Sequence, residues 1–228
     1  MTATARSSSQ RFDAADRLLF GVSLICGIAY FVTRGLPVFP GSVVIKGLSV
    51  SPLAVIAFRQ LVGSDQLLLA SALLFSALGD VFLGLGGEQW FVYGLSSFLI
   101  AHLFYITLFV RQWPRTAAAS VPRRVVAALL IVFAAAMFAG LWPSLGEMKL
   151  PVAAYMCALT GMSLTAALAG FRRWWVVIGA ALFMLSDSLI AVGKFMSPIA
   201  YSDYVIWATY YTAQVFIALG FILEKRRA

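Results

Sequence analysis

Four ionisable side chains lie inside long apolar runs of this sequence: Lys46, Asp80, His102 and Asp187. An ionisable group inside a lipid-facing or buried apolar segment is costly and is rarely kept without a task. Two carboxyl groups in a pocket of low dielectric constant suit acid–base chemistry, because different neighbours can leave one as an acid and the other as a base. The two aspartates are therefore the first candidates for catalysis.

Further polar residues accompany these four in the apolar runs or at their ends. They are Ser76, Tyr105, Tyr155, Ser186, Lys194, Tyr210, Tyr211 and Gln214. Asp80 is four residues after Ser76, and Gln214 is four residues after Tyr210, so each pair shares one face of a helix. We expect these side chains to orient water or substrate around the aspartates.

Each of these residues also has a purely structural interpretation. Lys46 can extend its amine to the membrane surface, His102 can be a hydrogen-bonded core residue, and the tyrosines can be packing or interface residues. The functional interpretation therefore depends on the group as a whole, and first on Asp80 and Asp187.

Other hydrolytic chemistries find little support in the sequence. A catalytic zinc ion has about three protein ligands, often histidines, and this chain has one histidine. The sequence contains no G-x-S-x-G motif, and the glycines at 84–87 lack the strand and lysine of a phosphate loop. Cys26 and Cys157 lie in apolar runs without ligand-spaced neighbours and are interpreted as packing residues. We expect neither a metal nor an organic cofactor.

The composition indicates a membrane protein. Of 228 residues, 62% are hydrophobic and 11% are charged, whereas soluble proteins have about 25% charged residues. So few charges cannot coat a globule of this size. The net charge of +8 could suggest nucleic acid, but the basic residues stand in short loops between apolar runs. We therefore expect membrane lipids, and no nucleic acid, as partners.

Eight apolar runs approach the roughly 20 residues needed to cross a bilayer. They are 17–34, 41–58, 66–86, 90–111, 122–142, 150–170, 174–193 and 203–223. Asp13 and Asp16 precede the first run and no cleavage site follows it, which argues against a signal peptide. The prediction is an all-α polytopic protein with one domain at 17–223, a polar N-terminal segment at 1–16 and a basic tail at 224–228.

The basic residues orient these spans. Thirteen of the 17 lysines and arginines fall on the side that carries both termini, and three fall on the other side. The positive-inside rule therefore predicts that both termini are cytoplasmic. Arginine outnumbers lysine 13 to 4, which is typical of bacteria with GC-rich genomes, so we expect a bacterial inner membrane.

In this orientation the polar residues form one layer. Asp80 and Asp187 each precede the outer end of their span by about six residues, or roughly 9 Å at ~1.5 Å per residue. His102, Tyr155 and Tyr210 reach the outer or middle part of three further spans. We predict a single polar cavity in the outer half of the membrane.

The sequence also contains a weak internal repeat. The segment LLFSALGDVFLGLG at 73–86 resembles ALFMLSDSLIAVG at 181–193. The two aspartates are 107 residues apart, and their spans run in the same direction. This pattern is compatible with two four-helix halves.

Several motifs resemble the YhhN-like family of membrane lysoplasmalogenases. They are FSALGDVFLGL at 75–85, FLIAHLFYITLF at 98–109, LFMLSDSLIAVGKF at 182–195 and TYYTAQVFIALG at 209–220. The likeness runs from about Lys46 to Gly220, and the motifs come in the order that the family has. In the family the lysine of the second span is usually followed by proline, whereas Gly47 follows it here.

The resemblance implies hydrolysis of the vinyl ether bond of lysoplasmalogens to a fatty aldehyde and a glycerophospho-ethanolamine or -choline. A positioned acid, a negative charge and a base suffice for this reaction. We expect Asp80 and Asp187 to be the catalytic pair, in roles that the sequence leaves unassigned. We expect Lys46 and Lys194 either to meet the lipid phosphate or to hold an aspartate ionised.

Two other classes of protein remain open. A small-solute or proton-coupled transporter also pairs intramembrane carboxylates, although transporters typically break helices near the midplane, and here Pro52 is the main proline within a span. A lipid-binding or scaffolding protein would tolerate loss of the aspartates.

Overall fold

The computed structural model describes residues 12–36, 39–114 and 119–226, and in these residues the chain is helical without any strand. The helices are α1 (Ala14–Thr33), α2 (Pro40–Gln60), α3 (Gly63–Leu85), α4 (Glu88–Val110), α5 (Val121–Leu141), the short η1 (Trp142–Ser144) and η2 (Gly146–Met148), α6 (Lys149–Leu168), α7 (Trp175–Phe195) and α8 (Ser202–Lys225). Eight of them are long and apolar enough to cross a membrane.

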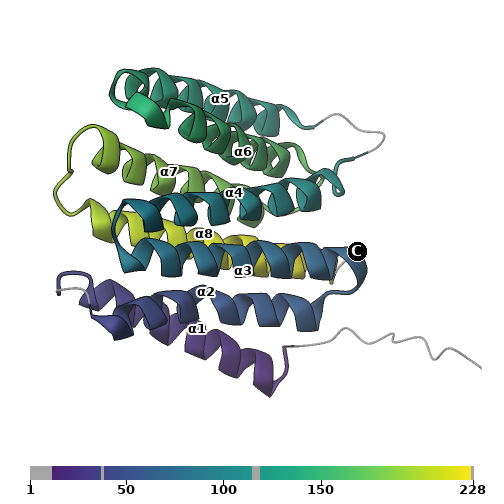
Figure 1. The fold of residues 1–228 in the computed structure, drawn as a ribbon. Helices are drawn as coiled ribbons and strands as arrows, with labels where there is room; N and C mark the ends of the chain where they lie inside the picture. Colours follow the sequence, from purple (N-terminus) through teal and green to yellow (C-terminus); the bar gives the residue numbers. More distant parts are fainter. Residues whose placement is uncertain (1–11, 37–38, 115–118, 227–228) are drawn as a thin grey trace, which may run out of the picture.

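The long helices lie side by side in one bundle (Figure 1). Consecutive helices pack against each other except α4 and α5, and the broadest contacts are between α3 and α4 and between α7 and α8. Helix α4 also packs on α6, and α8 packs on α2. The α3–α4 contact corresponds to the α7–α8 contact, and the α4–α6 contact corresponds to the α8–α2 contact. The same pairings therefore recur after four helices, which is the arrangement expected of two four-helix halves.

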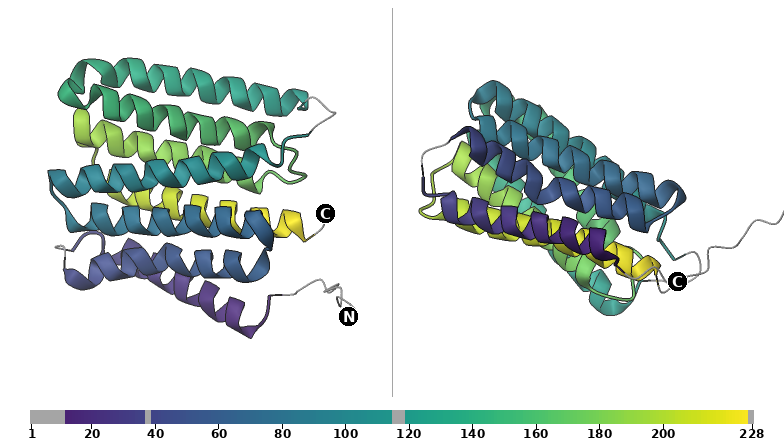
Figure 2. Two further views of the ribbon diagram at one scale, coloured as in Figure 1. Left: turned by 45° about the vertical axis from the view of Figure 1, so that its right-hand side comes forward. Right: turned by 90° about the horizontal axis from the view of Figure 1, so that it is seen from below.

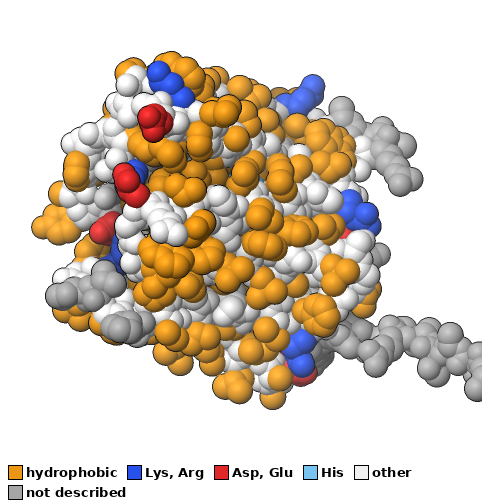
Figure 3. All heavy atoms as spheres, viewed as in Figure 1, with side chains coloured by type: hydrophobic (Ala, Val, Ile, Leu, Met, Phe, Trp, Pro, Cys, Tyr) orange, Lys and Arg blue, Asp and Glu red, His pale blue; other side chains and the backbone are white. Residues whose placement is uncertain are grey.

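The two ends of the bundle are polar and its flanks are apolar. Charged side chains gather at both ends in Figure 3, and hydrophobic side chains cover the surface between them. The start of α1 and the end of α8 lie at the same end of the bundle (Figure 2), which we call the termini end. The opposite end carries Arg34, Lys149 and Lys194 and is called the Arg34 end.

The predicted spans agree with the observed helices to within three residues at every boundary. The prediction of an all-α protein with eight transmembrane helices is thus confirmed. Residues 1–11 of the predicted N-terminal segment and residues 227–228 of the predicted tail lie outside the described residues.

A polar cluster holds α1 to α2 at the termini end. The Asp13 side chain caps α1 by accepting a hydrogen bond from the backbone N–H of Asp16 at 2.9 Å. Asp16 is fully buried, and its carboxylate accepts hydrogen bonds from Arg59 at 2.8 Å and from Gln60. A buried carboxylate is tolerated here because a cation and an amide surround it.

A glycine allows α7 and α8 to approach closely near the aspartate layer. A Cβ atom on Gly179 would lie 2.9 Å from the carbonyl oxygen of Ala213 and 2.8 Å from the Ile217 side chain. Backbone atoms cannot move aside as a flexible side chain would. This contact fixes the register that sets Ser186 and Asp187 of α7 beside Tyr210 of α8.

We predict that Gly179→Val lowers the free energy of unfolding by about 2 kcal/mol, since an added side chain overpacks the helix contact. Gly140→Val is the matched control, because a Cβ at Gly140 meets nothing within 4 Å. Thermal unfolding in detergent measures both variants. Equal melting temperatures for the two would contradict the proposed role of the α7–α8 contact.

Candidate active site

Asp80 of α3 is buried and has a partner for each carboxylate oxygen. Lys46 Nζ of α2 lies 3.4 Å from Oδ1, and the Tyr210 hydroxyl of α8 donates to Oδ2 at 2.6 Å. The Asp80 residue is 1% exposed. A cation and a hydrogen-bond donor are what a buried carboxylate needs.

A chain of hydrogen bonds extends from Asp80 into the core. The Tyr105 hydroxyl donates to Gln214 Oε1 at 2.8 Å, and Gln214 Nε2 donates to Tyr210 Oη at 3.2 Å. Since a phenol has a single hydroxyl hydrogen, the Tyr210 hydrogen goes to Asp80 and the chain has one direction. Tyr105 and Gln214 therefore orient Tyr210 as a donor to the carboxylate.

Asp187 of α7 has neutral partners instead. The Tyr155 hydroxyl of α6 donates to Oδ2, and His102 Nε2 of α4 lies 3.2 Å from Tyr155 Oη and 3.8 Å from Asp187 Oδ2. The Tyr155 hydrogen is committed to Asp187, so His102 Nε2 donates to the Tyr155 oxygen. Among the described residues, no hydrogen bond reaches Oδ1 of Asp187.

His102 is fully buried, and its Nδ1 atom has no hydrogen-bond partner among the described residues. Within the described residues neither a lysine nor an arginine pairs with Asp187, whereas Lys46 pairs with Asp80.

Both aspartates line one small cavity of about 330 Å³, together with Lys46, Ser186 and Tyr210. Sequence reasoning expected these groups to share a polar layer, and the structure brings them together. Asp80 is held by Lys46 of the preceding helix and by the Tyr210 ring of α8, the last helix of the other half. Asp187 is held in the same way by Tyr155 of the preceding helix and by the His102 ring of α4. The two aspartate environments are related in the same way as the two halves.

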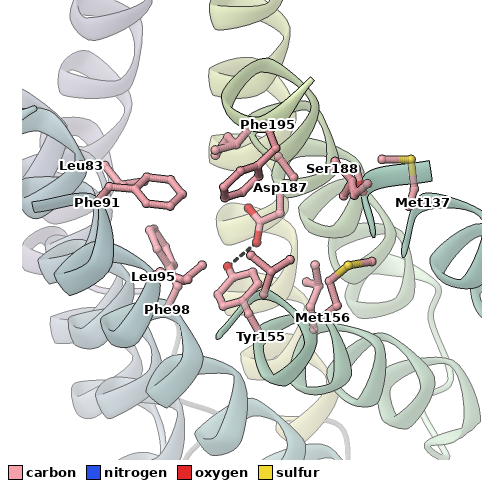
Figure 4. A pocket seen from close by; sticks show the side chains of 15 residues that line it. Leu83, Phe91, Leu95, Phe98, Met137, Tyr155, Met156, Asp187, Ser188 and Phe195 are labelled. Carbon is pink, nitrogen blue, oxygen red and sulfur yellow. Dashed lines mark hydrogen bonds between the residues drawn. The ribbon is translucent and has the colours of Figure 1, made fainter. Parts of the chain in front are cut away.

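A second, apolar pocket of about 620 Å³ adjoins this inner cavity (Figure 4). Its walls come from α3, α4, α5, α6 and α7 and are almost entirely aliphatic and aromatic, including Leu95, Phe98, Met156 and Phe195. Asp187 lines both the apolar pocket and the inner cavity, whereas Asp80 lines only the inner cavity. Asp187 therefore stands at the boundary between the two.

A third, polar cavity of about 1660 Å³ opens at the Arg34 end, and we call it the vestibule. Arg34, Lys46 and Tyr30 line both the vestibule and the inner cavity. The site consequently has a polar arm and an apolar arm that meet at the two carboxyl groups.

Of three further predicted residues, one lies in the inner cavity and two lie elsewhere. Ser186 lines the inner cavity, where its hydroxyl donates to the Ile206 carbonyl at 3.1 Å. Tyr211 lies on another face of α8, where its hydroxyl is 2.9 Å from Ser23 Oγ of α1. Lys194 is exposed and places its amine 5.1 Å from the centre of the Phe91 ring. The structure brings neither Tyr211 nor Lys194 to the aspartates.

Sequence reasoning missed Tyr30, Arg34 and Trp207. Lys46 Nζ lies 5.8 Å from the Tyr30 ring centre and 6.0 Å from the Trp207 ring centre, and the Trp207 indole donates to the Gly27 carbonyl at 2.9 Å. The spacing of Tyr30 and Arg34, four residues apart, was a signal available in the sequence. Gly47 allows α2 to approach α3 beside Lys46 and Asp80, since a Cβ atom on Gly47 would lie 2.9 Å from the Val81 side chain.

The arrangement places two carboxyl groups at one inner cavity, with an apolar pocket on one flank and the polar vestibule on the other. Within residues 12–36, 39–114 and 119–226, no three His, Cys, Asp or Glu side chains come close enough to hold a metal ion. The chemistry that these side chains support by themselves is proton transfer and stabilisation of a cation.

Comparisons with known proteins relate the chain to one family. The sequence model of the YhhN family matches residues 41–221. A lysoplasmalogenase of Mycobacterium bovis is 33% identical over 229 residues, which cover 92% of this chain and 87% of the relative. Human lysoplasmalogenase TMEM86A is 37% identical over 164 residues, covering 67% and 64%, and human lysoplasmalogenase TMEM86B is 36% identical over 163 residues, covering 69% and 65%. No solved structure matches the chain.

We predict that Lys46→Met lowers the free energy of unfolding by about 2 kcal/mol, because it leaves the Asp80 carboxylate buried without its cation. The double variant Lys46→Met/Asp80→Asn should recover part of that loss, since no unpaired charge remains. Thermal unfolding of the two single variants and the double variant gives the coupling between the two side chains.

Lys194→Met is the matched control for this cycle, because Lys194 is exposed, and it should leave the melting temperature unchanged. Additive effects of Lys46→Met and Asp80→Asn would show that the pair does not stabilise the fold as a unit.

Proposed function

Because the chain belongs to the YhhN family and is an ether-bond hydrolase, we propose that it hydrolyses the vinyl ether bond of lysoplasmalogens. The products are a fatty aldehyde and a glycerophospho-ethanolamine or -choline. The observation that carries this proposal is the position of Asp187 at the junction of the apolar pocket and the polar inner cavity. A lysoplasmalogen has its scissile bond at the same kind of junction, between an alkenyl chain and a polar headgroup.

The substrate is placed by its two ends. The alkenyl chain lies in the apolar pocket, where aliphatic and aromatic side chains replace the surrounding lipid. The headgroup lies in the vestibule, and the vinyl ether lies in the inner cavity between Asp187 and Asp80. This order puts the alkene carbon that carries the alkyl chain on the Asp187 side and the ether oxygen on the Asp80 side.

Asp187 is the general acid in this proposal. Hydrolysis of a vinyl ether begins when a proton is added to the alkene carbon farther from oxygen, which is the carbon on the side of the alkyl chain. Oδ1 of Asp187 has no partner among the described residues and faces the cavities. Among the described residues, no lysine or arginine pairs with Asp187, in contrast to Asp80. The proton moves from Oδ1 to that carbon, and the other alkene carbon becomes an oxocarbenium ion.

Asp80 is the anion and base. Its carboxylate, held ionised by Lys46 and Tyr210, stabilises the oxocarbenium ion by its charge. It then takes a proton from the water that adds to the cationic carbon, which gives a hemiacetal. As the hemiacetal collapses, Asp80 returns this proton to the glycerol oxygen and the Asp187 carboxylate takes the hydroxyl proton. One water is consumed, and both aspartates return to their starting states.

The remaining residues position this pair. Tyr105 and Gln214 orient Tyr210 toward Asp80, and His102 orients Tyr155 toward Asp187. Lys46 also lines the vestibule, so it can serve both the Asp80 carboxylate and the headgroup.

We further propose that the protein lies in a bacterial inner membrane with both termini in the cytoplasm. The excess of lysine and arginine on the termini end supports this orientation. The vestibule then opens to the outer face, and the enzyme takes its substrate from the outer leaflet.

We predict that the purified protein in detergent releases fatty aldehyde from a lysoplasmalogen. Asp80→Asn and Asp187→Asn should each lower turnover by at least about 100-fold, the contribution typical of a positioned acid or base. Asp65→Asn is the matched control, because Asp65 pairs with Arg111 and Lys225 at the termini end, and it should keep full activity.

Reaction in D₂O sharpens this test. Protonation of the alkene carbon should leave one deuterium on the carbon next to the aldehyde group, read by mass spectrometry. Full activity in both single aspartate variants would refute the catalytic pair. If the folded wild-type protein releases no aldehyde, a transporter becomes the better interpretation, and a flux assay in liposomes would examine it.

A labelling experiment tests the orientation. In a Cys26→Ala/Cys157→Ala background, Glu88→Cys lies at the Arg34 end and Arg124→Cys at the termini end. A membrane-impermeant maleimide added to intact bacterial cells should label the Glu88→Cys protein, and the Arg124→Cys protein only after the cells are opened. The reverse pattern would place the vestibule on the cytoplasmic side.

A further inference from the structure

The vestibule carries charges of both signs around one opening. Arg34 at the end of α1, Lys46 of α2 and Asp203 in the first turn of α8 all line it. The three charged groups thus come from the first two helices and the last one, and they converge at the mouth of the inner cavity. Their signs suggest a ligand that itself bears two opposite charges.

The cationic side of the vestibule is formed by Arg34 and Lys46. Arg34 Nη1 donates to the Tyr30 hydroxyl at 2.8 Å, and Nη2 lies 3.0 Å from Asp203 Oδ1. The Arg34 side chain is 26% exposed. A partly exposed guanidinium with a nearby ammonium suits a phosphate, which accepts several charge-assisted hydrogen bonds.

The anionic side of the vestibule is formed by Asp203. Its side chain is 64% exposed and is engaged with Arg34 through Oδ1, while no contact among the described residues involves Oδ2. Tyr201 and Tyr204, which neighbour Asp203 in sequence, also line the vestibule. A carboxylate beside aromatic rings suits an ammonium or quaternary ammonium group.

We propose that the vestibule is a binding site for a zwitterionic phosphate–ammonium headgroup and that Asp203 selects for the ammonium. Arg34 and Lys46 hold the phosphate, and Asp203 holds the ammonium. Each charge of the headgroup therefore lies beside the opposite charge of the Arg34–Asp203 pair. Lysolipids whose headgroup is a bare phosphate are disfavoured, because they bring a second negative charge toward Asp203 without a cation. This inference rests on the proposed function, since it places the headgroup of the same substrate.

Binding of soluble headgroup fragments tests the site without turnover. Saturation-transfer NMR on the full chain in detergent gives dissociation constants for glycerophosphoethanolamine, glycerol 3-phosphate and inorganic phosphate. The wild-type protein should bind glycerophosphoethanolamine about tenfold more tightly than glycerol 3-phosphate, the effect of roughly one charge pair. Asp203→Asn should abolish that preference, and Arg34→Gln should weaken the binding of both organic phosphates.

Two variants guard against a change in folding. Glu88→Gln removes an exposed carboxylate at the same end of the bundle but outside the vestibule, and it should leave all three dissociation constants unchanged. Arg34→Lys keeps the positive charge and should restore part of the affinity that Arg34→Gln loses.

Equal affinity of the wild-type protein for glycerophosphoethanolamine and glycerol 3-phosphate would overturn the proposal, as would a preference that survives Asp203→Asn. Inorganic phosphate that binds as tightly as glycerophosphoethanolamine would show an anion site without headgroup recognition and would overturn it too. Because none of these measurements depends on aldehyde release, failure of the headgroup site and failure of the proposed hydrolysis are distinguishable.

Discussion

The Asp80–Lys46 pair is the constraint on which the centre of this bundle depends. A carboxylate this deeply buried, in a helix that crosses a membrane, is stable only if a cation and hydrogen-bond donors surround it. Lys46 comes from α2 and Tyr210 from α8, so α2, α3 and α8 must converge on one point. Tyr30 and Trp207 pack around the lysine amine, and the glycine after Lys46 allows α2 to lie close against α3. The pair therefore organises one half of the inner cavity.

The second aspartate shows how one scaffold gives two chemical roles. Asp187 occupies in α7 the place that Asp80 occupies in α3, and each accepts a contact from the helix before it. That contact is a lysine for Asp80 and a tyrosine for Asp187. In the proposed mechanism, this exchange of a cation for a neutral donor separates the base in one half from the acid in the other. The proposed base and acid thus arise from one difference between similar halves.

The three cavities give this chemistry its proposed substrate class. The apolar pocket and the vestibule reach the inner cavity from different sides, and the aspartates lie where they meet. A site of this shape matches a molecule with one apolar end, one charged end and a reactive bond between them. Tyr105, Gln214 and His102 lie deeper in the core, where hydrogen bonds to Tyr210 and Tyr155 fix the direction in which each aspartate is approached.

The sequence by itself determined the membrane-spanning helices and most of the residues around the aspartates. Length and hydropathy are local properties, so each span could be predicted to within a few residues. Aspartates, a lysine and a histidine in apolar runs stand out because their burial is costly. The sequence could not exclude Tyr211 and Lys194, since a polar residue near a span end has the same signature whether it faces a cavity, another helix or the surface.

Only the tertiary structure decided how these residues pair. Helical periodicity relates residues within one helix but carries no information on which face of α8 meets α3, or that Tyr155 reaches Asp187 rather than Asp80. The division of the space into an apolar pocket and a polar vestibule also depends on the packing of helices distant in sequence. For the same reason Arg34 and Asp203, separated by most of the chain, could be recognised as neighbours only after folding placed them 3.0 Å apart.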